Sequence, residues 1–202
     1  MNKADFLAIV NSSYEEDMDI QARKFEDLEI MDEVFATVEF QNCEFRHCKI
    51  MASKMEKLTF ADCFFVNCDF SNTSFEKAAF IRCKFENCKG LGCNFVEARW
   101  YYVEVKNTLL NYANFSNACL EKTKFQETML KNASFQEVIL KTVQYENCNL
   151  LEAQFFKTKL NGIDFRTSNI EGISVSLESL KGAIVTDYQA VDLAKLIGLI
   201  IK

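Results

Sequence analysis

The sequence predicts an all-β fold: a right-handed, four-sided parallel β-helix of about eight coils, followed by a short C-terminal α-helix and strand. Two regularities predict it. From Phe25 to Leu180, every fifth residue is large and apolar at all 32 positions except Gly90. The position two residues earlier is mostly small, and the other three residues of each five are mainly polar or charged.

A period of five matches neither the 3.6 residues of a helical turn nor the two-residue repeat of a plain strand. The chain must therefore turn every five residues and point two of them inward. The position two after each large residue suits a corner, because it holds eight Asn and four of the six Gly, which tolerate a left-handed backbone. Eight square coils at ~4.8 Å per coil give a rod of roughly 38 Å.

Large residues on successive coils should stack inside the rod as ladders, each ring contributing ~1.5–3 kcal/mol by burial. Sixteen of the 19 Phe residues occupy these inward positions. Two ladders, on two faces of the coil, account for the core residues that we single out: Phe45, Phe65, Phe85, Phe95, Phe115 and Phe135. We expect the repeat to form one domain over residues 20–183.

Both ends of the chain depart from the repeat, and an uncapped solenoid end would polymerise. Residues 1–19 form an acidic N-terminal cap that fits either a short helix or a starting strand. Residues 184–202 form a C-terminal segment in which Thr186 and Gln189 have capping-box spacing and Gly198 is a helix stop. Apolar residues follow at helical spacing, and a short strand is expected at 199–201.

The C-terminal segment is unusually apolar for so short a tail. It either folds over the last coil as a cap or forms the seam of a homodimer, and both can hold. The residues assigned to the dimer interface are Leu193, Leu196, Ile197, Leu199, Ile200 and Ile201.

The composition indicates one domain of 202 residues with a net charge of −6 and no proline. No apolar run approaches the ~20 residues of a membrane span, and no secretory signal is visible, so we expect a cytoplasmic protein without membrane contact. The nine Cys residues are then reduced thiols. Eight of them occupy the small inward position, where they are packing residues; a zinc site would need C-x-x-C spacing or a His besides His47.

No group of residues indicates catalysis. His47 falls at an outward corner without a nucleophile motif, and no glycine-rich phosphate loop is present. A convex solenoid also offers no water-excluding cleft that could shift the pKa of its many carboxylates. We therefore expect neither an enzyme nor a bound cofactor or metal.

Charge is unevenly distributed along the chain. Residues 1–42 hold 11 acidic and 3 basic residues, a net charge of −8, whereas residues 43–202 hold 18 acidic and 20 basic, a net charge of +2. An acidic pole repels nucleic acid and attracts a basic surface, such as one that normally holds DNA; a solvated, solubilising cap is the alternative. The acidic residues assigned to partner contact are Asp17, Asp19, Glu26, Asp27, Glu29 and Asp32.

A second candidate surface is apolar and aromatic. Ile81, Tyr101 and Tyr102 should stand on adjacent coils of one face, beside Arg82 and Arg99. This composition is typical of a contact patch, and cross-strand packing of the tyrosines is the alternative.

These repeats closely resemble the pentapeptide-repeat family, whose repeat is written A(D/N)LXX; residues 112–118, YANFSNA, are a near-ideal example. Within that family the chain resembles the Qnr group, which protects DNA gyrase and topoisomerase IV from quinolones. The narrower resemblance rests on residues 92–95 (GCNF), residues 111–122 (NYANFSNACLEK), and a tail with DYQA at 187–190 and LIG at 196–198.

The resemblance implies a non-enzymatic DNA mimic that binds gyrase and topoisomerase IV as a homodimer joined through the C-terminal helix and strand. Two rods end to end would measure roughly 76 Å, about 22 base pairs. Two departures stand against it. Many Qnr proteins carry insertion loops important for protection, whereas the repeat here runs from 25 to 180 without an insertion. In addition, residues 43–202 are not acidic overall. The alternative is a scaffold or self-immunity protein that binds a different partner.

Overall fold

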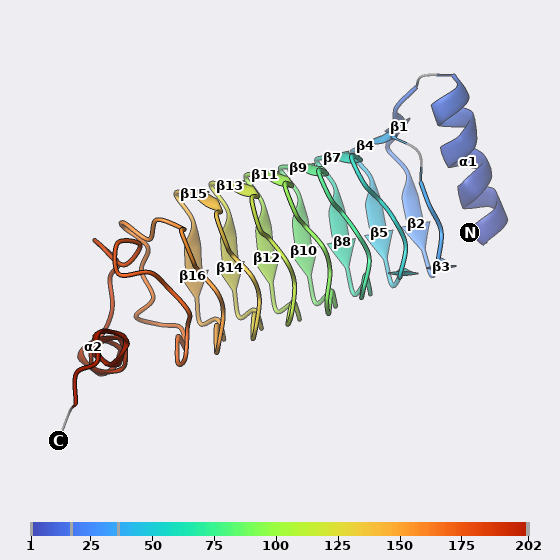
Figure 1. The fold of residues 1–202 in the computed structure, drawn as a ribbon. Coiled ribbons are helices and arrows are strands. Elements are labelled where there is room, and N and C mark those ends of the chain that lie inside the picture. The colour runs from blue at the N-terminus through green and yellow to red at the C-terminus, as the bar shows by residue number, and fades with distance from the viewer. Residues whose placement is uncertain (1, 17, 36, 201–202) are drawn as a thin grey trace.

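The computed structural model describes residues 2–16, 18–35 and 37–200. The chain forms a rod of parallel β-coils with a helix at each end (Figure 1). Helix α1 (Lys3–Glu15) lies across the N-terminal end. Helix α2 (Asp187–Ala194) and a 3-10 turn (Lys195–Ile197) lie at the C-terminal end. This is the parallel β-solenoid with a short C-terminal helix that the sequence predicts.

The faces of the rod are parallel sheets in which residues 20 apart pair across neighbouring coils, as Phe65 pairs with Phe85. The first face contains β1 (Ile20–Gln21), β4 (Glu39–Gln41), β7 (Thr59–Ala61), β9 (Ala79–Ile81), β11 (Arg99–Tyr101), β13 (Cys119–Glu121) and β15 (Ile139–Lys141). The second contains β2 (Lys24–Glu26), β5 (Glu44–Arg46), β8 (Phe64–Val66), β10 (Lys84–Glu86), β12 (Glu104–Lys106), β14 (Lys124–Gln126) and β16 (Gln144–Glu146). The third face begins with β3 (Glu29–Met31) and β6 (Lys49–Met51), and its later coils are joined by isolated β-bridges. The fourth face is joined by isolated β-bridges throughout, such as Val34 with Lys54.

Strands are short because the chain turns after every five residues, in a left-handed conformation at nearly every corner. Among the described residues, 26 that are not glycine have φ between 46° and 61°, all at the corner position that the sequence indicates. Asn is expected there, but Lys77 and Tyr102 adopt the same backbone, with φ of 59° and 55°. The corner N–H donates to the next coil, as Asn42 N–H does to the Ala61 carbonyl at 3.0 Å, and this bond helps to offset the strain.

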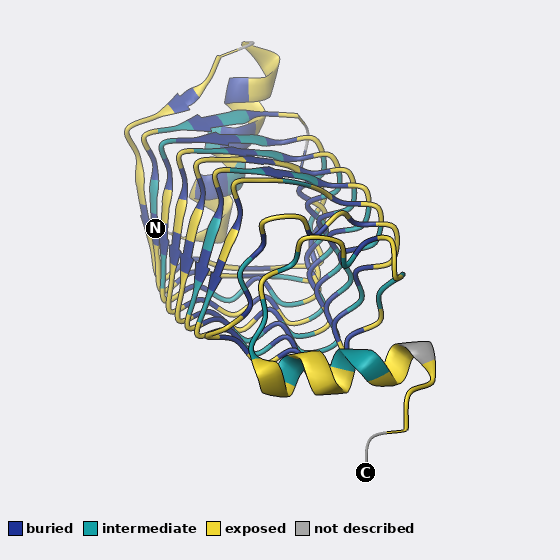
Figure 2. Cartoon of the chain, turned by 90° about the vertical axis from the view of Figure 1, so that its left-hand side faces the viewer, coloured by how far each residue is buried: buried dark blue, intermediate teal, exposed yellow. Residues whose placement is uncertain are grey.

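Buried residues recur on every coil along the rod (Figure 2), and their side chains form one continuous core. The rings of Phe115 and Phe135 are 4.9 Å apart and within 2° of parallel, and those of Phe65 and Phe85 are 4.5 Å apart. The six Phe residues singled out from the sequence are each at most 6% exposed: Phe45, Phe65, Phe85, Phe95, Phe115 and Phe135. Face-to-face stacking between coils and edge contacts within a coil therefore fill the interior.

The single break in the apolar series, Gly90, is closely packed. A Cβ there would meet Leu110 Cδ2 at 2.8 Å, so a larger residue requires the Leu110 side chain to shift. Trp100 lies in the same part of the core, stacked on Phe85 at 5.7 Å. A small residue and the one indole thus occupy this part of the core together.

The number of coils is slightly lower than the eight expected. The strand-paired solenoid makes about six turns. Beyond Glu146, successive coils are joined by isolated bridges, such as Gln154 with Ser174 and Asp164 with Ile184. The five-residue period continues there, but the coils no longer form continuous strand ladders.

Helix α1 closes the N-terminal end of the core. Asn2 caps it, because its side-chain oxygen accepts from the Asp5 N–H at 2.8 Å. Phe6 is fully buried, with its ring 5.1 Å from that of Phe25 and 6.3 Å from that of Phe40. The N-terminal segment therefore forms a helix rather than a starting strand, and this helix covers the first rings of the stacks.

Helix α2 begins at a capping box in which Thr186 and Gln189 bond each other's backbone N–H. The Gln189 amide also donates to the carbonyls of Phe165 and Ser168, which holds the helix against the last coils. Gly198, with φ of 78°, ends the helical segment.

The strand expected at 199–201 is not formed at Leu199 and Ile200, and Ile201 lies outside the described residues. The segment extends away from the last coil (Figure 2). A strand requires a neighbouring backbone to pair with, and no coil is beside this tail.

Replacing Phe115 by Ala should lower the free energy of unfolding by ~3–5 kcal/mol, because a fully buried ring in a stack leaves a cavity. Tyr112, 58% exposed at a corner, provides the matched control, and Tyr112→Ala should change stability much less. Urea unfolding followed by circular dichroism measures both. Equal midpoints for the two variants would contradict the inward placement of Phe115.

Candidate interaction surfaces

Acidic side chains surround the N-terminal end of the rod. Of the residues assigned from the sequence, five are described and exposed: Asp19, Glu26, Asp27, Glu29 and Asp32. Asp17 lies outside the described residues. Glu26 and Glu29 belong to the first strands of two faces, and Asp27 and Asp32 turn the chain at the corners that follow. The first coil therefore presents carboxylates on two adjacent faces.

Some of this acidic pole is paired with the second coil. Lys49 Nζ lies 2.7 Å from Glu29 Oε1, and this hydrogen bond lowers the pKa of Glu29. His47 Nδ1 is 3.9 Å from Asp27 Oδ1. Within the described residues, no ion pair involves Asp19, Glu26 or Asp32. Because these carboxylates have no basic partner in the part of the chain that the structure describes, the pole keeps a net negative charge, which can act over long range.

The aromatic patch lies on the first face. Tyr101 pairs in register with Ile81 on the neighbouring strand, and Ile81 is half-buried. Tyr101 and Tyr102 are 39% and 45% exposed, with their rings 4.5 Å apart at nearly a right angle. The structure thus brings these three residues together. This arrangement fits both a contact patch and cross-strand packing of the tyrosines.

Lys122, which the sequence interpretation missed, completes this patch. Its ammonium group donates to the Tyr102 hydroxyl, which lowers the pKa of Tyr102, and lies 4.4 Å from the Tyr102 ring centroid and 5.7 Å from that of Tyr101. Lys122 follows Tyr102 by one 20-residue coil, so the register alone could have found it. On the preceding coil, Arg82 is bound by Asp62, with Nε 2.6 Å from Oδ1.

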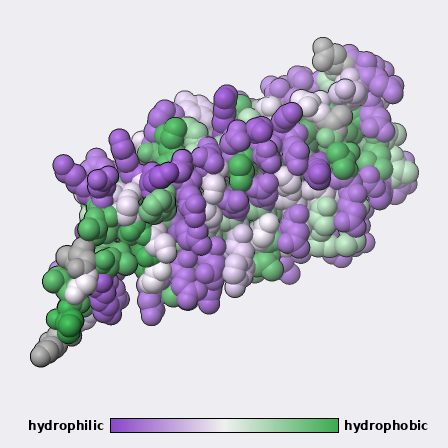
Figure 3. Space-filling view, viewed as in Figure 1, coloured by the Kyte–Doolittle hydropathy of each residue, from purple (hydrophilic) through white to green (hydrophobic). Residues whose placement is uncertain are grey.

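Apolar side chains at the C-terminal end are mostly exposed. Helix α2 has no buried residue, and Leu193 is half-buried. Leu196, Leu199 and Ile200 are 46%, 54% and 87% exposed. The side chain of Ile197 and all of Ile201 lie outside what the structure describes. Figure 3 shows hydrophobic side chains gathered around this end of the rod, a patch typical of an interaction site.

Eight Cys residues are buried at inward positions, and Cys119 on the outer face is partly exposed. Burial raises the pKa of Cys93 to about 12, and its thiol donates to the Phe70 carbonyl at 2.9 Å. In the described ranges, no group of three or more His, Cys, Asp or Glu side chains could hold a metal ion. His47 lies at an exposed corner, where its Nε2 is 3.1 Å from the Asn67 amide nitrogen.

No helix in the described part of the chain has the length and apolar character needed to cross a membrane.

The middle of the chain matches a known family model. Residues 58–135 match the model described as "Pentapeptide repeat region". Together with the square coils, this match identifies the fold as a pentapeptide-repeat solenoid, as the sequence resemblance implies. Comparison with curated protein sequences finds no match.

Solved structures of similar shape include QnrB1, a plasmid-mediated fluoroquinolone resistance protein. A trypsin-treated QnrB1 is 14% identical with a TM-score of 0.58, covering 90% of this chain and 100% of that one. HetL, a pentapeptide repeat protein involved in heterocyst differentiation regulation from the cyanobacterium Nostoc sp. strain PCC 7120, is 15% identical with a TM-score of 0.36, covering 93% and 98%. At 14% identity, the similarity to QnrB1 concerns the fold alone.

In the folded protein, only Cys119 should react rapidly with a thiol reagent. The reagent attacks the thiolate form of an accessible cysteine, and the eight other thiols are buried. Titration with Ellman's reagent, before and after addition of guanidinium chloride, measures this. Denaturation should release the remaining eight thiols, and Cys119→Ser should abolish the fast reaction. Rapid reaction of all nine thiols in the folded protein would contradict the inward assignment.

Proposed function

We propose that this protein binds DNA gyrase and topoisomerase IV as a homodimeric, DNA-like rod and protects them from quinolones. The observation that carries the proposal is the solenoid itself, which resembles QnrB1 with a TM-score of 0.58 over 90% of this chain. The acidic pole and the exposed apolar tail support it, because each provides one contact that such a protein needs. The action is binding and displacement, without a chemical step.

The acidic pole is suited to a surface that normally binds duplex DNA. Such a surface is lined by Lys and Arg, which attract the carboxylates of Asp19, Glu26 and Asp32 as they attract phosphates. If the apolar tails join two rods at their C-terminal ends, the acidic poles lie at the two distal tips. The dimer would then present negative charge at both ends of the rod.

The charge along the middle of the rod favours a second candidate, a scaffold or self-immunity protein with a different partner. A mimic that copied DNA along its whole length would be acidic on every coil, but here cross-coil ion pairs neutralise the second face. Lys84 Nζ is 2.9 Å from Glu104, and Lys124 Nζ is 2.8 Å from Glu146. Recovery of topoisomerase subunits from a host lysate separates the two candidates, since the second predicts that another protein dominates.

The test of the first proposal is a gyrase supercoiling assay with a fluoroquinolone, with and without the protein. We expect the protein to restore supercoiling. Asp27→Asn with Asp32→Asn should weaken gyrase binding about tenfold, or ~1.4 kcal/mol, through loss of charge attraction. Asn suits a left-handed corner, so the fold is retained.

The matched control is Glu127→Gln with Glu152→Gln, which removes two corner carboxylates far from the pole. It should leave binding unchanged. Absence of any binding, together with undiminished drug inhibition, would reject the proposal. Equal losses in the two double variants would reject the role of the pole.

The dimer is tested at the tail. Leu199→Asp should produce monomers, because a carboxylate at an apolar seam is costly to bury. Leu177→Asp is the control, since Leu177 is 57% exposed outside the tail. Sedimentation equilibrium measures both variants. An intact dimer of Leu199→Asp would place the seam elsewhere, and a monomeric wild type would reject the homodimer.

A further inference from the structure

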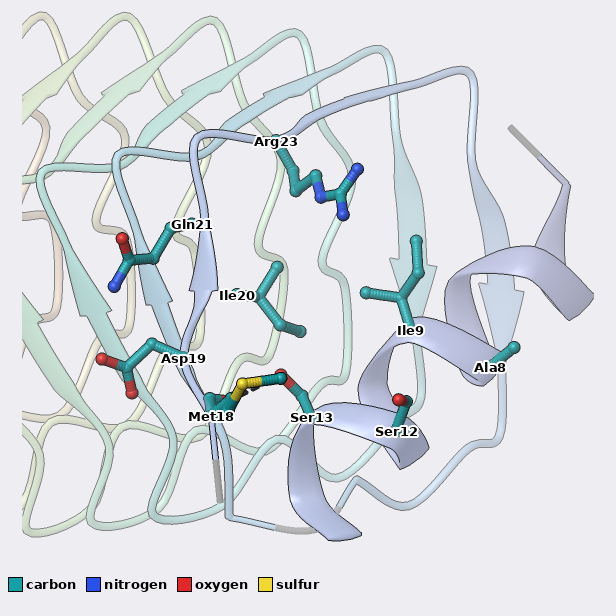
Figure 4. A pocket seen from close by; sticks show the side chains of 9 residues that line it. All are labelled: Ala8, Ile9, Ser12, Ser13, Met18, Asp19, Ile20, Gln21 and Arg23. Carbon is teal, nitrogen blue, oxygen red and sulfur yellow. Dashed lines mark hydrogen bonds between the residues drawn. The ribbon is translucent and has the colours of Figure 1, made fainter. Parts of the chain in front are cut away.

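The N-terminal end of the rod is the edge of its sheets. Strands β1 and β2 are each the outermost strand of a seven-stranded sheet, paired on one side only, with β4 and β5. An outermost strand presents backbone groups that can pair with another extended chain. Helix α1 covers the stacked rings of the core, but the rim where β1 turns into β2 extends beyond it (Figure 4).

The 20-residue register shows which backbone groups face outward at this rim. The Ala22 N–H donates to the Gln41 carbonyl, and the Glu44 N–H donates to the Arg23 carbonyl, both at 2.9 Å. The Gln21 carbonyl and the Lys24 N–H are the equivalents, one coil earlier, of the Gln41 carbonyl and the Glu44 N–H. They therefore point to where a preceding coil would lie, and they present one acceptor and one donor to an incoming backbone.

A cleft of about 830 Å³ adjoins this rim, a volume within the range of binding pockets. Helix α1 forms one wall and the edge of the first coil forms the other (Figure 4). The residues on the two walls include Ala8, Ile9 and Ser12 from α1 and Ile20, Gln21 and Arg23 from the edge. The Ser13 hydroxyl donates to the Met18 carbonyl at 2.6 Å and fixes the helix beside the cleft.

Charge indicates which segment would occupy the cleft. Asp19 and Arg23 both line it, so its own lining is balanced in charge, but Glu15 and Glu16 at the end of α1 and Glu26 and Asp27 along the edge make its surroundings acidic. Arg23 and Lys24 are the only basic residues between positions 4 and 42, against 11 acidic residues in positions 1–42. An extended segment rich in Lys or Arg is attracted by this field, and an acidic one is repelled.

We propose that this cleft binds an extended basic segment of a partner protein, which follows the edge from β1 across the Ala22 corner to the start of β2, as a preceding coil would. The Gln21 carbonyl accepts from the segment and the Lys24 N–H donates to it, while apolar side chains of the segment contact Ala8 and Ile9. Because β1 has only two residues before the corner, pairing is short and the complex is weak and reversible. The site serves any partner that has such a segment, topoisomerase or not.

The test uses the purified full-length protein and labelled peptides, with binding followed by fluorescence anisotropy. The probe is a short peptide of alternating Lys and Val. One comparison peptide carries N-methyl groups on alternate amides, which keeps its charge but prevents strand pairing, and another replaces Lys by Glu. We expect the Lys peptide to bind, the N-methylated peptide to bind about tenfold more weakly, and the Glu peptide not to bind.

Two tryptophan variants on α1 locate the site. Ser12→Trp fills the cleft, whereas Asn11→Trp places the same side chain at an exposed position of the helix that does not line it. Ser12→Trp should weaken binding of the Lys peptide about tenfold and Asn11→Trp should not. No binding of the Lys peptide, equal binding of the N-methylated peptide, or equal behaviour of the two variants would overturn the proposal. The peptide-binding experiment contains no topoisomerase, so its result does not depend on the result of the gyrase assay.

Discussion

The whole structure depends on a turn after every five residues, which at nearly every corner is made by a residue in the left-handed conformation. Each such corner costs ~1–2 kcal/mol when the residue is not glycine, and 26 non-glycine residues adopt it. Two inward side chains accompany each corner, and burial of the larger one contributes ~1.5–3 kcal/mol. The backbone of the corner also bonds the next coil. The strain is therefore compensated within each five-residue unit, which allows the same unit to repeat along the rod.

The residues that stabilise the rod are different from those available for interaction with partners. Stability comes from two inward positions, so the outward positions are free to vary, and on most of the rod they carry mixed charges paired between coils, such as Lys49 with Glu29. Distinctive chemistry is found where the pattern changes: the acidic first coil, the apolar tail, and the patch of Tyr101, Tyr102 and Lys122. The proposed contacts with topoisomerase, a second copy and a basic segment all use these places.

The period of five predicted the solenoid, and the structure places Phe115 and the other singled-out rings in its core, because spacing alone decides which side chains point inward. The ends were harder. The N-terminal sequence fitted a helix or a strand, since Phe6 acquires its role only when the open end of the core is present. Leu199 and Ile200 are apolar, but a strand also needs a partner backbone. The patch predicted from the sequence did not include Lys122, and the cleft beside α1 was not predicted. Both bring together residues that are distant in the sequence.

Spin-label distances along one face test the solenoid most directly. Labels would be introduced as unnatural amino acids, because the nine Cys residues complicate thiol labelling. Positions 24, 124 and 164 occupy the same place in the 20-residue register, with five coils between the first two and two more to the third. The separation of 24 from 164 should therefore exceed that of 24 from 124 by about 10 Å, two coils at ~4.8 Å. That increment is what stacked square coils require. Two equal distances, or a shorter one for the more distant pair, would contradict the account.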